Sequence, residues 1–325
     1  MPLVITASPS NQDKHLSEIY ALLIHNDKLY SAAVDGKIKV WHPNLELEAE
    51  FQAHESAIYH IAAHKDTLYS CSNDGTLQAW SLDGLKHKKT LFQSSDEEIL
   101  RLYVIDGTLY SGNDKGILSV WKNDKLQCLF SMVEEIRDFS VADNLMYTVR
   151  DRDVCINELM PEEPAASIFN LEGTIKFLHS IPNFFQYITV LKPIFYYASK
   201  GDRGHYIMRK TLEGRSPLCI VGNKLCFATR SGNNICVHEN SQASSFKELG
   251  QIQAHEMILN ALCGFEDSTL FSGGYDGKVK QWNLETLECI NTCEVGFCIN
   301  TICIGSQGQV YVAGDNGFIN RLDNK

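Results

Sequence analysis

The sequence predicts an all-β fold, a β-propeller built from eight four-stranded blades. Three observations predict it. Short apolar runs alternate with tight turns, as strands and hairpins do. A unit of this kind recurs along the chain, with first strands that begin near residues 19, 58, 99, 136, 175, 216, 258 and 299. The resulting period of about 40 residues is the length of one four-stranded propeller blade.

The clearest unit spans 253–283 and reads QAHEMILNALCGFEDSTLFSGGYDGKVKQWN. It holds three short apolar runs, and a tight turn at Asp276-Gly277 follows the second. The third run, 278–282, has the period-two alternation of a strand. An Asp-Gly turn beside such a run is typical of a β-hairpin, so the unit is predicted to form a small meander. A sheet of this size buries too little surface to be stable alone, and the units are therefore expected to pack together.

Other copies of the unit differ in how closely they match it. Two close copies lie at 15–41 and 54–80, and a third ends at Trp121 but has Ser95 where the others have histidine. Three divergent units and one final unit complete the series, at 136–157, 175–197, 217–238 and 299–322. Because the divergent units are hard to delimit, seven blades with one long irregular insertion is the alternative to eight.

Each blade is expected to contain strands a, b and c from the unit and an outer strand d from the run that follows it, such as 47–51 or 167–171. The last unit is followed by no such run, whereas the chain has a spare strand at 3–7. We expect this N-terminal strand to complete the blade of 299–322 and close the ring, which protects an exposed sheet edge. A closed ring would use residues 1–325 as a single domain.

Composition narrows the functional classes. The net charge of −11 argues against general nucleic-acid binding, which needs a basic stripe. The sequence has no run of about 18 apolar residues, so no transmembrane helix is expected. The short N-terminal apolar run is not preceded by the basic segment of a signal peptide, so no signal peptide is expected. None of the eleven cysteines lies in a Cys-x-x-Cys pair, so we expect buried thiols and no metal site. These features favour a cytoplasmic protein, with a nuclear location as the alternative.

The repeat units resemble the WD-repeat (WD40) β-propellers over essentially the whole chain. In that family a histidine, a strand-b serine, the b–c turn aspartate and a tryptophan form a buried hydrogen-bond network, in which the carboxylate is paired. The resemblance assigns this structural network to His15, Ser31, Asp35 and Trp41, to His54, Ser70, Asp74 and Trp80, and to His255, Ser272, Asp276 and Trp282. The Trp-Asp dipeptide that names the family is absent, because the residues after the tryptophans are His42, Ser81, Lys122 and Asn283.

No enzyme motif occurs in the sequence. It has no Gly-rich phosphate loop before a helix, no His-Glu-x-x-His and no Gly-x-Ser-x-Gly. We therefore expect a non-catalytic protein without a cofactor. A propeller enzyme is the alternative, because such enzymes assemble their sites from distant blades.

Binding residues are predicted from the geometry of the blade. The start of strand a and the end of strand b lie on one face, and strand a is innermost, so these positions surround the mouth of the central channel. The second position of strand a is assigned to Leu259 in the unit 253–283. The predicted partner-binding residues are Arg137, Arg150, Arg230, Lys176, Tyr20, Tyr59 and Tyr275. Arginine and tyrosine are typical of interaction hot spots, so we predict an adaptor that docks a protein or peptide on the face formed by the d–a and b–c loops.

The positions of Arg137 and Arg150 also resemble those of the phosphate-binding arginines in F-box/WD-repeat phosphodegron receptors. Arg230 matches that pattern only in its position within the repeat. Those receptors are eight-bladed propellers that hold phosphate at these columns. The resemblance implies a second possible function, a reader of phosphorylated or acidic peptides, because forked arginine bonds suit phosphate. This chain has no F-box, and acidic Asp114 and Asp315 occupy two of the same columns. The identity of the partner and the oligomeric state are left open.

Overall fold

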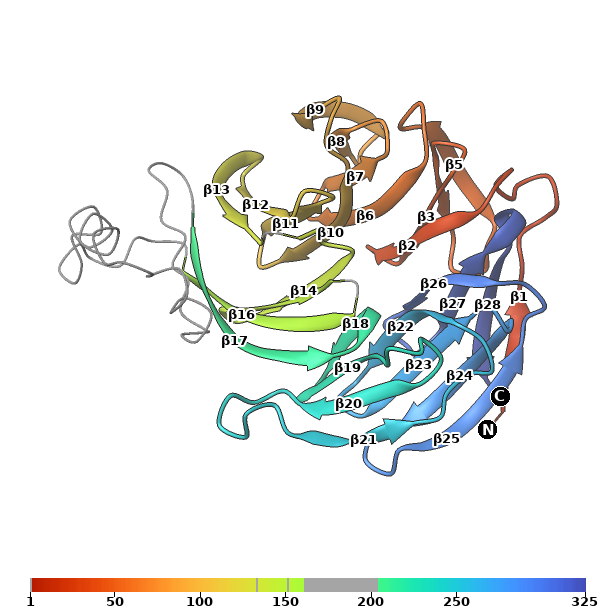
Figure 1. Ribbon diagram of the computed structural model, residues 1–325. Coiled ribbons are helices and arrows are strands. Elements are labelled where there is room, and N and C mark those ends of the chain that lie inside the picture. Colours follow the sequence, from red (N-terminus) through yellow and green to blue (C-terminus); the bar gives the residue numbers. More distant parts are fainter. Residues whose placement is uncertain (1, 133, 151, 161–203) are drawn as a thin grey trace, which may run out of the picture.

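The computed structural model describes residues 2–132, 134–150, 152–160 and 204–325. These residues form seven four-stranded antiparallel sheets arranged in a ring, so the fold is the predicted all-β propeller (Figure 1). The predicted count of eight blades is wrong, and the alternative count of seven is confirmed. The described part of the chain holds no helix with the length and apolar character needed to cross a membrane.

Each sheet is one blade, and its strands follow the chain from the channel outward as a, b, c and d. Blade 1 contains β2 (Ile19–His25), β3 (Lys28–Ala33), β4 (Lys37–Trp41) and β5 (Leu47–Gln52). Blade 2 contains β6 (Ile58–His64), β7 (Thr67–Ser72), β8 (Thr76–Ser81) and β9 (Lys86–Gln93). Blade 3 contains β10 (Ile99–Ile105), β11 (Thr108–Asn113), β12 (Ile117–Lys122) and β13 (Lys125–Ser131).

The second half of the ring repeats the same order. Blade 4 contains β14 (Asp138–Ala142), β15 (Leu145–Val149), β16 (Asp153–Met160) and β17 (His205–Glu213). Blade 5 contains β18 (Arg215–Val221), β19 (Lys224–Ala228), β20 (Ile235–Glu239) and β21 (Glu248–Ile252). Blade 6 contains β22 (Leu259–Phe265), β23 (Thr269–Gly274), β24 (Lys278–Asn283) and β25 (Glu288–Glu294). Blade 7 contains β26 (Ile299–Ile304), β27 (Val310–Gly314), β28 (Ile319–Asn324) and β1 (Leu3–Ala7), with a short 3₁₀ turn, η1 (Asp315–Gly317), before β28.

The difference of one blade comes from the chain after β16. The predicted fifth unit, 175–197, and the predicted outer strand 167–171 lie outside the described residues. The outer strand of blade 4 is instead β17, which pairs with β16 in register from Asp153↔Glu213 to Met160↔His205. The backbone N–H of Leu218 in blade 5 donates directly to Asp138 of blade 4 at 3.0 Å, so these two blades are neighbours.

The N-terminal strand closes the ring, as the sequence predicted. Strand β1 pairs with β28 through Leu3↔Asn324 and Ile5↔Leu322, and Leu3 is buried in the core between blades 6 and 7. The N–H of Lys325 donates to the carbonyl of Pro2 at 3.0 Å, which places the two ends of the described chain side by side (Figure 1).

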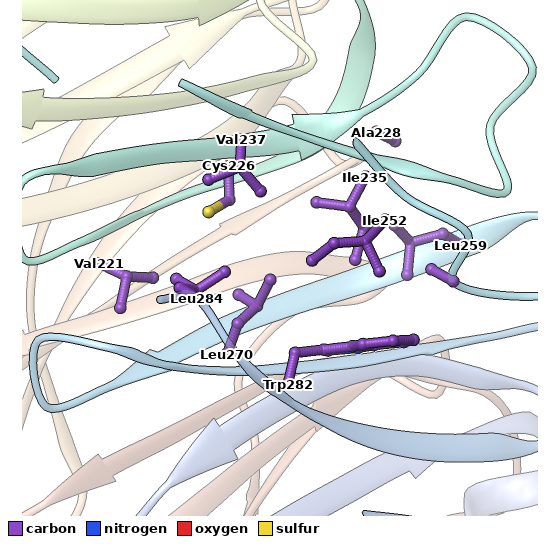
Figure 2. Packing of buried hydrophobic residues seen from close by; sticks show 11 residues of the cluster. Val221, Cys226, Ala228, Ile235, Val237, Ile252, Leu259, Leu270, Trp282 and Leu284 are labelled. Atoms are coloured by element: carbon purple, nitrogen blue, oxygen red, sulfur yellow. The ribbon is translucent and has the colours of Figure 1, made fainter. Parts of the chain in front are cut away.

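The hydrophobic core lies between neighbouring blades. Figure 2 shows this packing between blades 5 and 6, where Trp282 and Leu270 lie near Val221 and Ile252. Strand b of each blade is covered on both faces, so β7 is buried along its whole length. The outer strand β5 alternates between partly buried and exposed residues, because one of its faces contacts solvent.

Candidate functional site

The d–a loops and b–c turns meet on one face of the ring, where side-chain networks join them. In blade 2, Trp80 Nε1 donates to Ser70 Oγ at 2.8 Å, and Ser70 Oγ lies 2.6 Å from His54 Nε2. His54 Nδ1 lies 2.9 Å from Asp74 Oδ2, and Asp74 also accepts the backbone N–H of Thr76 at 2.9 Å. The network therefore ties the d–a loop, which carries His54, to the b–c turn, which carries Asp74.

The protonation of this network follows from its partners. A carboxylate can accept hydrogen bonds but not donate them, so His54 Nδ1 donates to Asp74, and His54 Nε2 accepts the hydroxyl proton of Ser70. Burial lowers the pKa of His54 more than the nearby carboxylate raises it, which keeps the ring neutral. Burial alone would raise the pKa of Asp74, but hydrogen bonds from Thr76 and His54 hold it below its usual value.

The same four residue types come together in blades 1 and 6. In blade 1, Trp41 Nε1 lies 2.8 Å from Ser31 Oγ, Ser31 Oγ lies 2.7 Å from His15 Nε2, and His15 Nδ1 lies 3.1 Å from Asp35 Oδ2. The corresponding distances in blade 6 are 2.8, 2.7 and 2.9 Å for Trp282–Ser272, Ser272–His255 and His255–Asp276. The loops are so close that a Cβ on Gly36, which has a φ of 72°, would lie 2.2 Å from the carbonyl oxygen of His54.

Blade 3 joins its loop and turn by other residues. Trp121 Nε1 still donates to Ser111 Oγ at 2.9 Å, but Ser95 occupies the histidine column and is exposed. Here Asn113 Nδ2 donates to Glu97 Oε2 at 2.7 Å, and Asn113 Oδ1 accepts the N–H of Ile117 at 2.6 Å. This arrangement was not predicted from the sequence, because neither Asn113 nor Glu97 occupies one of the four repeat positions of the family network.

The centre of the face is a polar hollow of about 180 Å³ at the inner ends of the a strands. Register shifts at the start of strand a, for example between Ile99 and Arg101, leave one residue unpaired and turn the next toward the channel. Similar shifts occur in blades 1, 2, 6 and 7. In blade 6 strand a begins at Leu259, one residue later than predicted, so its second position is Asn260, which lines the hollow. The assignment of Leu259 was wrong, and Leu259 is buried in the core.

Arg101 and Asp138, which sequence reasoning missed, form an ion pair beside this hollow. Arg101 Nε lies 2.9 Å from Asp138 Oδ1, and Asp138 Oδ2 accepts the N–H of Leu218 at 3.0 Å. The Asp138 carboxylate therefore links blades 3, 4 and 5. Counted from the predicted strand starts at 99 and 136, both residues are third in strand a, a position that the prediction did not include.

His60 of blade 2 lies next to Arg101, and its Nδ1 is buried with no hydrogen-bond partner. Burial, together with the positive charge of Arg101, holds the pKa of His60 well below its usual value. Its imidazole is therefore neutral and contributes no positive charge to the hollow. Across the described ranges, no three His, Cys, Asp or Glu side chains are grouped so that they could hold a metal ion.

The three described arginines of the predicted site are paired within the protein. Arg137 Nε lies 3.2 Å from Glu135 Oε2, and Arg150 Nη1 lies 2.9 Å from Glu134 Oε1. Arg230 contacts two carboxylates of blade 4, Asp153 at 3.2 Å and Glu213 at 3.4 Å. Of these arginines, Arg137 lines the central hollow. Lys176 lies outside the described residues.

The three predicted tyrosines lie on the same face. The rings of Tyr20 and Tyr59 are tilted with centroids 6.4 Å apart, and the Tyr59 hydroxyl donates to Glu98 at 3.1 Å. Burial, Glu18, Tyr275 and Asp315 all raise the pKa of Tyr20, so Tyr275 and Asp315 also lie close to it. The structure therefore brings the tyrosines of blades 1, 2 and 6 to one side of the channel mouth.

Tyr20 and Tyr275 belong to a larger group of exposed apolar residues, here called the apolar patch. Ten large hydrophobic residues of the described chain are exposed, and six of them lie on the d–a loops, b–c turns or strand a ends of blades 6, 7 and 1. The six are Leu16, Tyr20, Met257, Ile258, Tyr275 and Phe318. Leu16 is 88% exposed, and Met257 and Tyr275 are each 53% exposed. The other four lie on outer strands.

Comparison with known proteins supports the fold and the repeats. The family model described as "WD domain, G-beta repeat" matches residues 45–81 and 246–283, which contain the networks of blades 2 and 6. The WD40 β-propeller domain of Doa1 has a similar structure, with a TM-score of 0.73 at 13% identity over 99% of this chain and 97% of that one. The computationally designed Ika8 protein gives a TM-score of 0.62 at 15% identity over 98% of each chain. No curated protein sequence matches this chain.

At such low identities, the solved structures show the fold alone. The F-box-type layout of eight blades is not supported, since the described residues form seven. This chain thus carries WD40 repeats at 45–81 and 246–283 and folds as a seven-bladed β-propeller over its described residues.

Proposed function

We propose that this protein is a non-catalytic scaffold that docks a protein partner on the face formed by the d–a loops and b–c turns, with the apolar patch at the centre of the contact. The observation that carries the proposal is the gathering of six exposed apolar side chains on three consecutive blades of that face. Exposed apolar side chains that gather on one face are typical of interaction sites.

The composition of the patch suits a protein contact. Tyr20 and Tyr275 present large apolar rings with a polar end, the residue type most enriched at binding hot spots. Acidic Glu18 and Asp315 lie beside Tyr20, which supplies a polar rim. The ring of Phe318 is covered on one side by Lys14 Nζ at 4.4 Å from its centroid and stacks on Phe297, so it is held in place before any partner binds.

The hydrogen-bond networks supply rigidity beneath this surface. His15 and His255 connect the loops of blades 1 and 6, from which Leu16, Met257 and Tyr275 project. A surface whose loops are already ordered loses less conformational entropy on binding, which favours affinity.

A phosphopeptide reader is the second candidate, favoured by the position of Arg137 in the central hollow near Arg101. The carboxylates that pair with Arg137, Arg150 and Arg230 count against it, because a phosphate would have to displace them. Exposed pairs of this kind are weak, so they lower the expected phosphate affinity without abolishing it.

The experiment that tests the proposal is affinity capture from cell lysate with four purified proteins. They are the wild type, Tyr20→Ser/Tyr275→Ser, the matched outer-strand control Ile290→Ser and Arg137→Ala/Arg150→Ala, each with and without phosphatase treatment. We expect specific partners to be lost with the tyrosine variant and kept by the other two. Ile290 is 50% exposed, so its substitution controls for a general loss of exposed apolar surface.

Retention of all partners by the tyrosine variant would show that docking takes place elsewhere. Loss of the same partners with the arginine variant and with phosphatase would instead establish the phosphopeptide reader. Circular dichroism of each variant excludes misfolding as the cause of a loss.

A further inference from the structure

A cavity of about 300 Å³ lies between blades 2 and 3, away from the apolar patch. Its apolar wall comes from Phe92 of β9, Ile117 and Trp121 of β12, and Leu126 and Leu129 of β13. Leu126 is 42% exposed, so the cavity reaches the protein surface. Pockets for small molecules typically hold about 300–1,000 Å³, so this one has room for a large side chain more readily than for a whole ligand.

The cavity exists partly because blade 3 lacks a long side chain that other blades have. In blade 1, Lys39 lies two residues before Trp41 and is 4% exposed. Its Nζ lies 6.0 Å from the Trp41 ring centroid and donates to the carbonyl of Asp13 at 2.7 Å. Lys280 fills the corresponding space in blade 6. Blade 3 has Ser119 at this position, and Ser119 lines the cavity.

A second missing side chain enlarges the same space. In blade 2 the ring of His54 lies against Ser70, which also accepts the indole N–H of its blade. Blade 3 has the exposed Ser95 in the histidine column, and its Ser111 lines the cavity beside Trp121. Blade 3 has serine at two positions, 95 and 119, where blades with the full network have larger side chains. The space that those side chains fill is a pocket in blade 3.

The rim of this pocket is acidic. The d–a loop before blade 3 reads Asp96-Glu97-Glu98, and Glu97 itself lines the pocket. Among the described residues, none of these three carboxylates takes part in an ion pair with a lysine or arginine. The nearby Lys115 is paired with Asp114 at 2.5 Å. An apolar pocket beside carboxylates that form no ion pair is complementary to an apolar side chain with basic neighbours.

We propose that this pocket is a second docking site, which takes one aliphatic or aromatic side chain of a partner peptide whose adjacent lysine or arginine contacts the loop 96–98. The site is separate from the apolar patch, so a test that overturns this proposal leaves the function proposed above unaffected, and the reverse also holds. It would give the propeller two contacts with a partner at different places on the ring.

The test is a selection from a displayed library of random short peptides, followed by fluorescence anisotropy with the selected peptides. The key variant is Ser119→Gln, which fills the pocket without adding charge and places there the residue that blade 2 has as Gln78. Ser119→Lys imitates blades 1 and 6. Asp96→Asn/Glu97→Gln reduces the rim from three carboxylates to one, and Tyr20→Ser/Tyr275→Ser removes the two tyrosines of the apolar patch. Urea unfolding of each variant checks that it is folded.

We expect the wild type to select peptides with an apolar residue next to lysine or arginine. Ser119→Gln should weaken their binding by about tenfold or more. The Asp96→Asn/Glu97→Gln variant should weaken it and reduce its dependence on salt, while the tyrosine variant should leave it unchanged. Equal binding to wild type and to folded Ser119→Gln would overturn the proposal. So would selected peptides without the basic–apolar pair, or a selection that enriches no peptide.

Discussion

Blades 2 and 3 are neighbours in the ring, but they connect their loops in different ways. Blade 2 places a histidine ring between its serine, aspartate and tryptophan, and this ring is buried between the blades. Blade 3 joins the same loop and turn through the buried Asn113 and the partly buried Glu97, and a cavity lies beside them. A four-stranded blade therefore forms without the complete network. In blade 3, which lacks the histidine, a cavity lies beside Ser111 and Trp121.

The largest expected effect on stability comes from removing the tryptophan from a blade of each kind. Trp282→Ala in blade 6 should destabilise the protein by about 3–5 kcal/mol, because the ring is buried and well packed. Trp121→Ala in blade 3 should cost less, because a cavity already lies beside that ring. Urea unfolding followed by circular dichroism measures both. Equal losses would mean that the cavity does not loosen the packing of blade 3.

The next test removes the turn residue from each kind of blade. Asp276→Ala leaves the buried His255 without the acceptor for its N–H and should cost about 1–3 kcal/mol. The matched change Lys115→Ala in blade 3 removes an exposed side chain and should stay within about 0.5 kcal/mol of the wild type. The same unfolding measurement applies, and a large effect of Lys115→Ala would contradict the comparison.

Acid should affect the two kinds of blade differently. Burial lowers the pKa of His54 and His255 in the folded state, so the unfolded chain binds more protons as the pH falls. This stability contribution is complete above the ordinary histidine pKa of about 6.5 and is lost below it. Asp35 and Asp74, whose pKa values are also lowered, add a further loss below 3.8. Hydrogen exchange at about pH 7 and pH 5 should show blades 2 and 6 losing protection before blade 3, whose strands contain no histidine.

The smallest effect is expected from rebuilding the network in blade 3. Ser95→His with Lys115→Asp restores the missing histidine and aspartate beside Ser111 and Trp121. A new buried hydrogen-bond chain should add about 1 kcal/mol of stability. Ser95→Ala with Lys115→Asp is the control, because it supplies the carboxylate without its partner. A rebuilt blade that is no more stable than this control would show that the network requires more than its four side chains.

Much of the fold could be predicted from the sequence because short-range sequence patterns define each repeat unit. Asp-Gly turns and alternating runs placed most a, b and c strands, and the columns of the network identified residues that do lie within hydrogen-bond distance. The blade count failed because a strand-like pattern says nothing about which strand it pairs with. The run at 175–197 matched the period, whereas the strand that completes blade 4 comes later, at His205–Glu213.

The candidate site was harder to predict, for two physical reasons. A one-residue bulge at the start of strand a lets its third residue line the hollow in blade 3, so Arg101 was missed. Asn260 was missed because the start of strand a in blade 6 was predicted one residue too early. The charges around each arginine depend on loops from other parts of the chain, so the pairing of Arg230 with Glu213 has no signature in the local sequence. The tyrosines were predicted as binding residues from their positions in the repeat, whereas the exposed Leu16 and Met257 carry no repeated pattern.

The pairing of β1 with β28 has a consequence for synthesis on the ribosome. Strand β1 is synthesised long before its partner β28, so blade 7 cannot form until residues up to Asn324 have been translated. At about 5–20 residues per second, β1 waits on the order of tens of seconds with its hydrogen-bonding edge open. During that interval its apolar sequence, LVITA, is a target for chaperones and for misfolded contacts. Closure of the ring therefore waits for the synthesis of β28.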